Sequence, residues 1–571
     1  MSEVTVAEEP IAGAPEWPLR PWLLAGLLGL AGLLIWLVTE GRDDVPWSMA
    51  VAAFLFFGAI AAAFTLERGR WVQPAIFSAG AGLVMAGLAW RAVQYGEYLP
   101  DEQYGFAAGV VATALALPLF QAEFHRRRFA TPYREVFALV WTDAISAAGA
   151  LAFTGISWIV LALMSELFHL LKIDFLSDLM DEGAFGWAFS GLAAGAALGT
   201  IRNQLKVLNV MQTVVLLVAS LLALPVAVAL VVFLLATAVS GPQVLWDATR
   251  SATPLLLACA AGAFVLTNAI ARQDDETMTR NRVMRIAGWG LAAVILPLAV
   301  FAAFSMGLRL DQYGLAPERL WGLVAIFVAC VCGVAYWVAL ARGRKAGWAA
   351  NLRRSTFHFG LVVCGLALLL ALPILDFGAI STRNQVARLE AGRVEVDAFD
   401  FSALRWDFGE PGRRALQRLA KSGNGQIAEL ADAALAQSSR VYGFGESLRA
   451  ESDFDVRVQP DDPTLRALVL DFLKGNAWQC QEQCVAVDLG PEDGGRRVAI
   501  VQGSGYQVVV LKPGQPGMFA PETAAAAVPL GEDSTVEIRE VPTPYIFIDG
   551  KPVGPPVPRP TAPLEGSEPP R

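Results

Sequence analysis

The sequence predicts an all-α polytopic transmembrane helix bundle of about eleven spans, followed by a C-terminal α+β domain outside the membrane. Of the 571 residues, 55% are hydrophobic and only 17% are charged, and the mean hydropathy is +0.47. This composition is too apolar for an ordinary soluble protein. The apolar residues gather in runs close to the roughly 20 residues that cross about 30 Å of hydrocarbon, and no such run follows Asp376.

The runs are separated by charged or turn residues, which set their approximate bounds. The first run follows an acidic segment, residues 1–20, and has no small-residue cleavage site behind it, so we expect a retained span and not a signal peptide. The expected spans are Pro21–Val38, Trp47–Leu66, Trp71–Trp90, Gly105–Phe120, Val136–Met164, Phe185–Ile201, Leu208–Ser240, Thr253–Ala271, Ile286–Leu308, Leu320–Ala341 and Phe357–Leu375.

The seventh run, Leu208–Ser240, is long enough for one kinked helix or a tight hairpin, because Pro225 interrupts it. Positive residues concentrate in cytoplasmic loops. With a single crossing, the loops on the N-terminal side hold 18 Lys and Arg residues and the loops on the other side hold 6. A hairpin would place the basic clusters at 272–285 and 342–354 outside. The charges therefore predict one crossing, with residues 1–20 in the cytoplasm and everything beyond the transmembrane domain (21–376) in the periplasm.

The region 377–551 has the composition of a soluble α+β domain, and residues 552–571 form a Pro-rich tail that we expect to be disordered. Expected helices are Pro411–Lys421, Gln426–Ser438 and a capped helix around Leu465–Leu473. Expected strands are Val485–Leu489, Arg497–Gln502, Tyr506–Leu511, Thr535–Val541 and Tyr545–Ile548.

Cys480 and Cys484 are the one cysteine pair in the soluble region. In an oxidising periplasm they are candidates for a short-loop disulfide. The alternative is two reduced thiols in a cytosolic domain. A zinc site is disfavoured, because the region contains no His and no further Cys to complete four ligands.

Several classes of function are disfavoured by what the chain lacks. Residues 377–571 carry 27 acidic and 20 basic side chains, so no basic surface suggests nucleic-acid binding. No phosphate-binding loop or nucleophile elbow is visible. We therefore expect no catalytic residues, metal or cofactor, although an enzyme with an active site inside the membrane remains an alternative. The expected partners are the lipid bilayer and an envelope protein.

Charged groups deep in a bilayer are costly and often functional, and Asp143 is the best candidate here, about two turns inside the fifth span. The alternative is a carboxylate that faces a wet cavity or pairs with a neighbouring loop arginine. In the sixth span, Gly191, Gly195 and Gly199 repeat at four-residue spacing, which predicts close helix packing. The partner helix belongs either to this chain or to a second copy.

Residues 164–180 have apolar side chains at helical spacing, opposite a mostly acidic face. One interpretation is an amphipathic helix along the outer membrane interface. The other is a simple extension of the fifth span.

Three stretches resemble one bacterial family: Ser157–Ile173, Leu310–Trp321, and the segment from Asp376–Leu389 through Asp407-Phe408-Gly409. The chain is similar to the polytopic proteins grouped as domain of unknown function 4153. The resemblance implies an inner-membrane protein with a C-terminal extramembrane domain, and it brings no reaction, ligand or catalytic residue. Its most specific piece is an outer-loop motif that we interpret as a hydrogen-bonded turn, which caps two spans or docks the outer domain. The motif residues are Gln312, Tyr313, Gly314, Pro317, Glu318 and Arg319.

Two functions are consistent with these observations. The first is a non-enzymatic envelope scaffold or sensor, since the membrane centre is almost free of ionisable groups and a sizeable soluble domain follows it. The second is a transporter or flippase of an apolar or lipid-like substrate, suggested by the number of spans and by Pro225.

Overall fold

The computed structural model describes residues 17–42, 44–100, 102–240, 252–343, 347–437, 440, 454–476, 479–480, 483–492, 495–502, 505–512, 518–525, 546–548 and 551–553. The predicted strand Thr535–Val541, most of the N-terminal segment and most of the predicted tail lie outside these ranges. The chain divides into two compact units, Met1–Arg440 and Val441–Arg571. The first unit therefore includes the helices between residues 377 and 440, which the sequence places with the C-terminal domain.

Within the described residues, eleven helices are long and apolar enough to span a membrane, and the predicted fold class is confirmed. Helix α9 runs unbroken through Pro225, so the seventh run is a single helix and not a hairpin. The eleven helices are α1 (Arg20–Thr39), α2 (Pro46–Thr65), α3 (Val72–Tyr95), α4 (Glu102–Gln121), α6 (Tyr133–His169), α8 (Gly183–Asn203), α9 (Leu205–Ser240), α11 (Ala252–Ala271), α12 (Arg282–Tyr313), α13 (Pro317–Gly343) and α14 (Trp348–Ala371).

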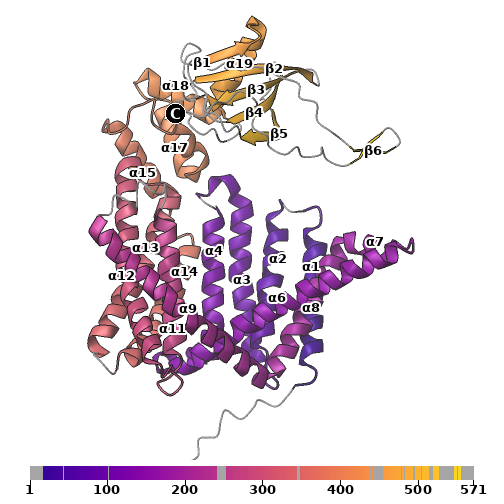
Figure 1. Cartoon of the computed structure of the whole chain (residues 1–571), viewed down its shortest axis with the longest axis vertical. Helices are drawn as coiled ribbons and strands as arrows, with labels where there is room; N and C mark the ends of the chain where they lie inside the picture. The colour runs from indigo at the N-terminus through magenta and orange to yellow at the C-terminus, as the bar shows by residue number, and fades with distance from the viewer. Residues whose placement is uncertain are drawn as a thin grey trace, which may run out of the picture. The chain divides into compact units, whose positions relative to one another are not determined.

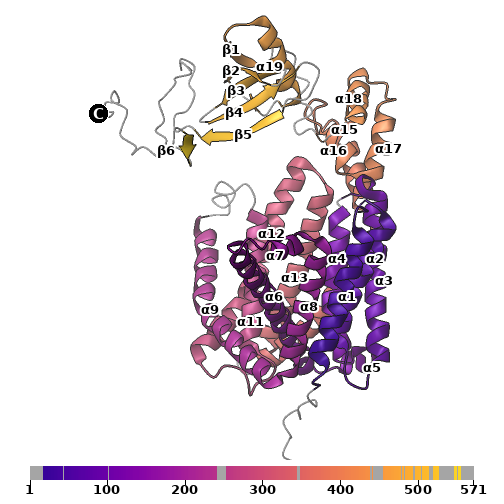
Figure 2. The ribbon, with the colours of Figure 1, turned by 90° about the vertical axis from the view of Figure 1, so that its right-hand side faces the viewer.

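The spanning helices pack in two groups. Helices α1–α4, α6 and α8 form the first, and α9 with α11–α14 forms the second (Figure 1). The two groups meet mainly where α4 packs on α14. The second group has the larger core, in which Leu291, Leu298 and Tyr336 are fully buried. Figure 2 shows α9 at the edge of the bundle, and its many exposed Val and Leu side chains suit contact with lipid.

The segment after the fifth span is helical in two separate pieces. Helix α6 continues to His169 and thus extends the span, and a separate short helix, α7 (Phe175–Asp181), precedes α8. Short turns of helix also connect other spans: η1 (Gly96–Tyr98), α5 (Phe124–Arg127) and η2 (Arg128–Ala130).

Four helices cover one end of the bundle, where α12 ends and α13 begins, and we call them the platform (Figure 1). Asp376, Asp400 and Asn424 accept hydrogen bonds at the N-termini of three of them, which satisfies backbone donors that a helix start leaves free. The platform helices are α15 (Phe377–Glu390), α16 (Phe401–Trp406), α17 (Gly409–Leu419) and α18 (Gly425–Ala436).

The second unit is an α+β domain with a five-stranded sheet in the order β1-β2-β3-β4-β5. Strands β1 and β2 are parallel and are connected by helix α19, and the other neighbours are antiparallel. Leu465, Val469 and Leu473 of α19 pack on one face of the sheet. The elements are β1 (Asp455–Gln459), α19 (Pro463–Gly475), β2 (Gln483–Glu492), β3 (Gly495–Gln502), β4 (Gly505–Leu511) and β5 (Met518–Ala525), followed by a hairpin of β6 (Ile546–Ile548) and β7 (Lys551–Val553).

Candidate functional site

The outer-loop motif forms the tight turn between α12 and α13. Helix α12 ends at Tyr313, Gly314 follows with φ of +69°, and α13 begins at Pro317 with Glu318 in its first turn. A side chain at position 314 would be strained by this φ and would also meet Arg388 and Gln385. Arg319 donates hydrogen bonds to the carbonyls of Tyr313 (3.0 Å) and Gly314 (2.7 Å). The motif is thus a turn whose free carbonyls are satisfied by its own arginine.

Side chains of platform helix α15 form hydrogen bonds with the same turn, and we call this set of contacts the clamp. Gln385 donates to the carbonyls of Tyr313 and Leu315, both at 2.8 Å, and Arg388 donates to the carbonyls of Asp311 (3.1 Å) and Gln312 (2.7 Å). The Asn384 side chain accepts a hydrogen bond from the Leu315 amide. Because the last carbonyls of a helix lack intrahelical partners, these contacts fix the platform to the end of the bundle.

Sequence reasoning missed the three clamp residues, Asn384, Gln385 and Arg388. In the sequence, the stretch Asp376–Leu389 stands out only by its family resemblance. The signal that could have found them is their spacing, since Arg388 lies four positions after Asn384 and three after Gln385, and residues three or four apart on a helix share one face.

The rest of the platform is held together by polar and aromatic contacts. Arg440 pairs with Asp400 (3.1 Å) and Asp407 (2.8 Å). The guanidinium of Arg413 lies 4.1 Å from the ring centroid of Tyr98 in η1, a cation–π contact with the loop between α3 and α4. The platform therefore contacts two loops at the same end of the bundle.

Asp407 gives the platform a pH-sensitive group. Partial burial raises the pKa of its carboxyl from 3.8 to about 6, with Asp400 and Glu318 adding to the rise and Arg440 opposing it. A pKa that is higher in the folded state contributes stability below pH 3.8 and loses it as the pH rises through about 6.

Asp407→Asn is therefore expected to flatten the pH dependence of platform stability between about pH 4 and pH 6. Thermal unfolding of the purified chain in detergent, followed from pH 4 to pH 7, would measure this. The wild-type melting temperature should rise on acidification by an increment that the variant lacks. Asp432→Asn, which changes an acidic residue of the adjacent helix α18, is the control, and an identical pH profile for wild type and Asp407→Asn would contradict the prediction.

Asp143 lies in a polar cluster at the opposite end of the first helix group. It is buried and accepts a hydrogen bond of 2.8 Å from Gln121 of α4. Its charge interacts with Arg202 of α8, whose guanidinium donates to the Ala63 carbonyl at 2.9 Å. The carboxylate of Asp143 on α6 therefore interacts with side chains of both α4 and α8 near the end of the span.

Gly191, Gly195 and Gly199 lie on the face of α8 that packs against α1. A Cβ atom at these positions would overlap the backbone of Leu28, Leu24 and Pro21, respectively. The partner helix in this structure therefore belongs to the same chain.

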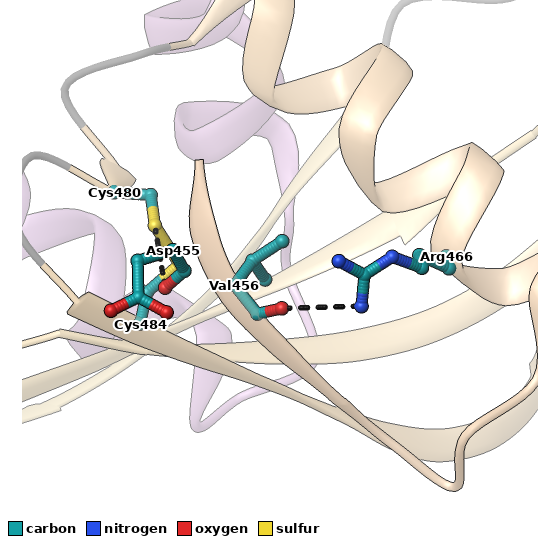
Figure 3. The surroundings of a disulfide bond; sticks show 5 residues. All are labelled: Asp455, Val456, Arg466, Cys480 and Cys484. Atoms are coloured by element: carbon teal, nitrogen blue, oxygen red, sulfur yellow. Dashed lines mark hydrogen bonds between the residues drawn. A yellow bond between two sulfur atoms is a disulfide. The ribbon is translucent and has the colours of Figure 1, made fainter. Parts of the chain in front are cut away.

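Cys480 and Cys484 are joined by a disulfide that links the segment after α19 to the start of β2, and their Cα atoms are 5.4 Å apart (Figure 3). Both side chains are buried in the core beneath α19. Nearby, Arg466 of α19 donates to the Val456 carbonyl of β1 at 3.4 Å (Figure 3). In the described part of the chain, no group of three or more His, Cys, Asp or Glu residues could hold a metal ion.

An apolar cavity of about 520 Å³ lies between the two helix groups. Its walls come from α4, α11, α12, α13 and α14, and a smaller pocket of about 180 Å³ adjoins it at the platform end. Sequence reasoning did not predict this cavity, because it depends on how the two groups meet.

The eleven helices and the cavity between them define a multi-pass membrane protein. The family described as domain of unknown function DUF4153 matches residues 29–419, and the chain belongs to this family. The match covers nearly all of the spanning helices together with platform helices α15–α17. No curated protein and no solved structure matches the chain.

Proposed function

We propose that this protein is a non-enzymatic scaffold or sensor of the bacterial inner membrane, whose helix bundle anchors an α+β domain in the periplasm. The clamp of α15 on the α12–α13 turn carries the proposal. It makes the platform a rigid continuation of the bundle, and Arg440 at the end of the platform directly precedes the second unit. A platform fixed to the bundle in this way attaches the soluble domain that follows it to the membrane.

The orientation is supported by charge. The basic residues of 126–134 and 272–285, with Arg342, Arg353 and Arg354, lie in or beside the helix connections at the end of the bundle opposite the platform. Glu123 there is shared by Arg70, Arg126 and Arg127, and Asp274 and Asp275 pair with Arg134 and Arg353, so basic side chains outnumber acidic ones at that end. Because positive loops stay in the cytoplasm, the platform and residues 377–551 belong in the periplasm, where the Cys480–Cys484 disulfide would persist.

One set of experiments tests both the orientation in the membrane and the attachment of the soluble domain through the platform. Alkaline phosphatase and fluorescent-protein fusions after Gly378 and after Arg571 should report the periplasm at both points, and a cytoplasmic signal at either would refute the orientation. A photo-crosslinking amino acid at the exposed Leu489 should then capture an envelope component in cells. The double variant Gln385→Ala, Arg388→Ala, which removes four clamp hydrogen bonds, should cut this capture about fivefold or more, as each such bond contributes roughly 1 kcal/mol.

Arg393→Ala is the matched control, since this arginine is exposed and lies just beyond α15. Equal capture by the double variant and the control, at equal protein levels, would contradict attachment through the clamp. No capture by any form of the protein would contradict the scaffold itself.

The cavity between the helix groups favours a second candidate, a transporter or flippase of an apolar or lipid-like substrate. Asp143→Asn and Pro225→Ala test it. Loss of cellular function in both variants, with the protein still folded and inserted, would favour transport over a scaffold role, and unchanged function in both would count against it.

A further inference from the structure

The cavity between the helix groups has the size and lining of a ligand site. Its volume of about 520 Å³ falls within the roughly 300–1,000 Å³ that is common for small-molecule sites. Its walls are almost wholly apolar, from Ala107 and Val111 of α4 through Leu257 of α11 to Val324 of α13 and Leu366 of α14. Ala107, Val111 and Ala261 in the lining remain exposed, so the cavity is open. Such walls suit an apolar ligand, such as the acyl chain of a lipid.

A second pocket, with charged residues in its walls, lies beside this cavity at the platform end. Trp321 and Leu370 line both spaces. Trp321 stacks on Tyr104 with ring centroids 5.4 Å apart and meets the edge of Phe377 at 5.2 Å. Aromatic residues of this kind mark the level of the lipid headgroups. The two neighbouring spaces thus lie one after the other, from the apolar cavity between the helices to the end of the bundle that carries the platform.

The charged side chains of the second pocket differ in how they are partnered. Asp376 accepts a hydrogen bond from the Ala379 amide and Glu410 accepts one from Arg414, so each carboxylate has a donor within the protein. Arg91, about one turn before the end of α3, is half-buried. Among the side chains that the structure describes, none forms a hydrogen bond or ion pair with it. A half-buried guanidinium of this kind favours an anion that offers two oxygens, such as a phosphate.

We propose that these two neighbouring spaces bind one phospholipid of the surrounding bilayer, with an acyl chain in the apolar cavity and the phosphate at Arg91. A soluble phosphate would leave the cavity without an occupant, and a neutral hydrocarbon would leave Arg91 without a partner. A phospholipid satisfies both, and it reaches the open cavity from the membrane itself. This site is independent of the proposed scaffold role and of the orientation of the chain.

The test uses the full chain in nanodiscs with phosphatidylglycerol that carries a diazirine near the end of one acyl chain. After photolysis, mass spectrometry should locate the label on the cavity walls of α13 or α14, between residues 324–332 or 359–370. Arg91→Gln should reduce labelling about fivefold, and Arg91→Lys should largely restore it, because the charge is kept. Ala261→Phe, which fills the cavity, should reduce labelling similarly, and Ala258→Phe on an exposed face of the same helix should not.

A diacylglycerol probe with the same diazirine chain but no phosphate separates headgroup from chain recognition. It should label the wild-type cavity about as weakly as phosphatidylglycerol labels Arg91→Gln, and free inorganic phosphate should not compete. Equal labelling by the two probes, or label outside the cavity, would overturn the proposal. If Arg91→Gln fails to fold, the comparison of the two probes and of Ala261→Phe with Ala258→Phe still tests whether the cavity binds a phospholipid.

Discussion

Gly195→Leu is expected to prevent stable packing of α1 against α8 and to cost about 3 kcal/mol or more, at or above the upper end of the range for overpacked cores. A Cβ at position 195 already overlaps the backbone at Leu24 and Ala25, and backbone cannot rotate away as a side-chain tip can. The two helices are also tied at their ends, where Arg20 donates to the Arg202 carbonyl and Asn203 donates to the Trp17 carbonyl. If α1 slid along α8 to relieve the steric overlap, these hydrogen bonds would break.

The measurement is the melting temperature and the inserted yield of the purified chain in detergent. Gly155→Leu is the matched control, because Gly155 on α6 has open space where a Cβ would be added. A variant at Gly195 that melts like the control would show that α1 and α8 do not meet at the glycines. If instead a dimer dissociated while the monomer stayed stable, the glycines would join two copies of the chain.

The spans were predictable because their signal is local. Hydropathy over about 20 residues can be evaluated without knowing which helices pack together. The distribution of charges among the loops predicted a single helix for residues 208–240. The ends were less accurate. Helix α12 runs from Arg282 to Tyr313, whereas its apolar run covers Ile286–Leu308, because its polar terminal turns continue beyond the apolar stretch.

The platform could not be assigned from hydropathy, since its attachment is made by side chains that bind backbone carbonyls. Gln385 and Arg388 look like ordinary polar residues of a soluble helix until the α12–α13 turn is placed beneath them. For this reason the compact unit extends to Arg440, past the last apolar run. The glycine spacing on α8 likewise predicted a close approach without identifying α1 as the partner.

In the second unit, the strands with alternating β-branched residues were predictable and the two edge strands were not. Strand β1 is only five residues long and pairs in parallel with β2, which comes after α19. Strand β5 contains Pro521, a residue that argues against a central strand and is tolerated at an edge. Both edges are set by tertiary pairing, and single-sequence patterns carry little information about it.

Asp143→Ala is expected to destabilise the first helix group by about 2 kcal/mol, within the range for removing a hydrogen-bond partner from a buried polar group. Arg202 keeps its bond to the Ala63 carbonyl but loses the negative charge that interacts with it. Gln121 loses its 2.8 Å acceptor and keeps only the Phe64 carbonyl at 3.0 Å. Thermal unfolding in detergent measures the effect.

Asp143→Asn separates the hydrogen bond from the charge, because its amide oxygen still accepts from Gln121. If the carboxylate is structural, melting temperatures should fall in the order wild type, Asn, Ala, and the double variant Asp143→Ala, Arg202→Met should recover part of the loss, since no unpaired charge remains. Additive losses in that cycle would show that Arg202 does not depend on Asp143. A stable Asp143→Asn protein that fails in cells would instead assign the charge to transport, because packing would be intact while function was lost.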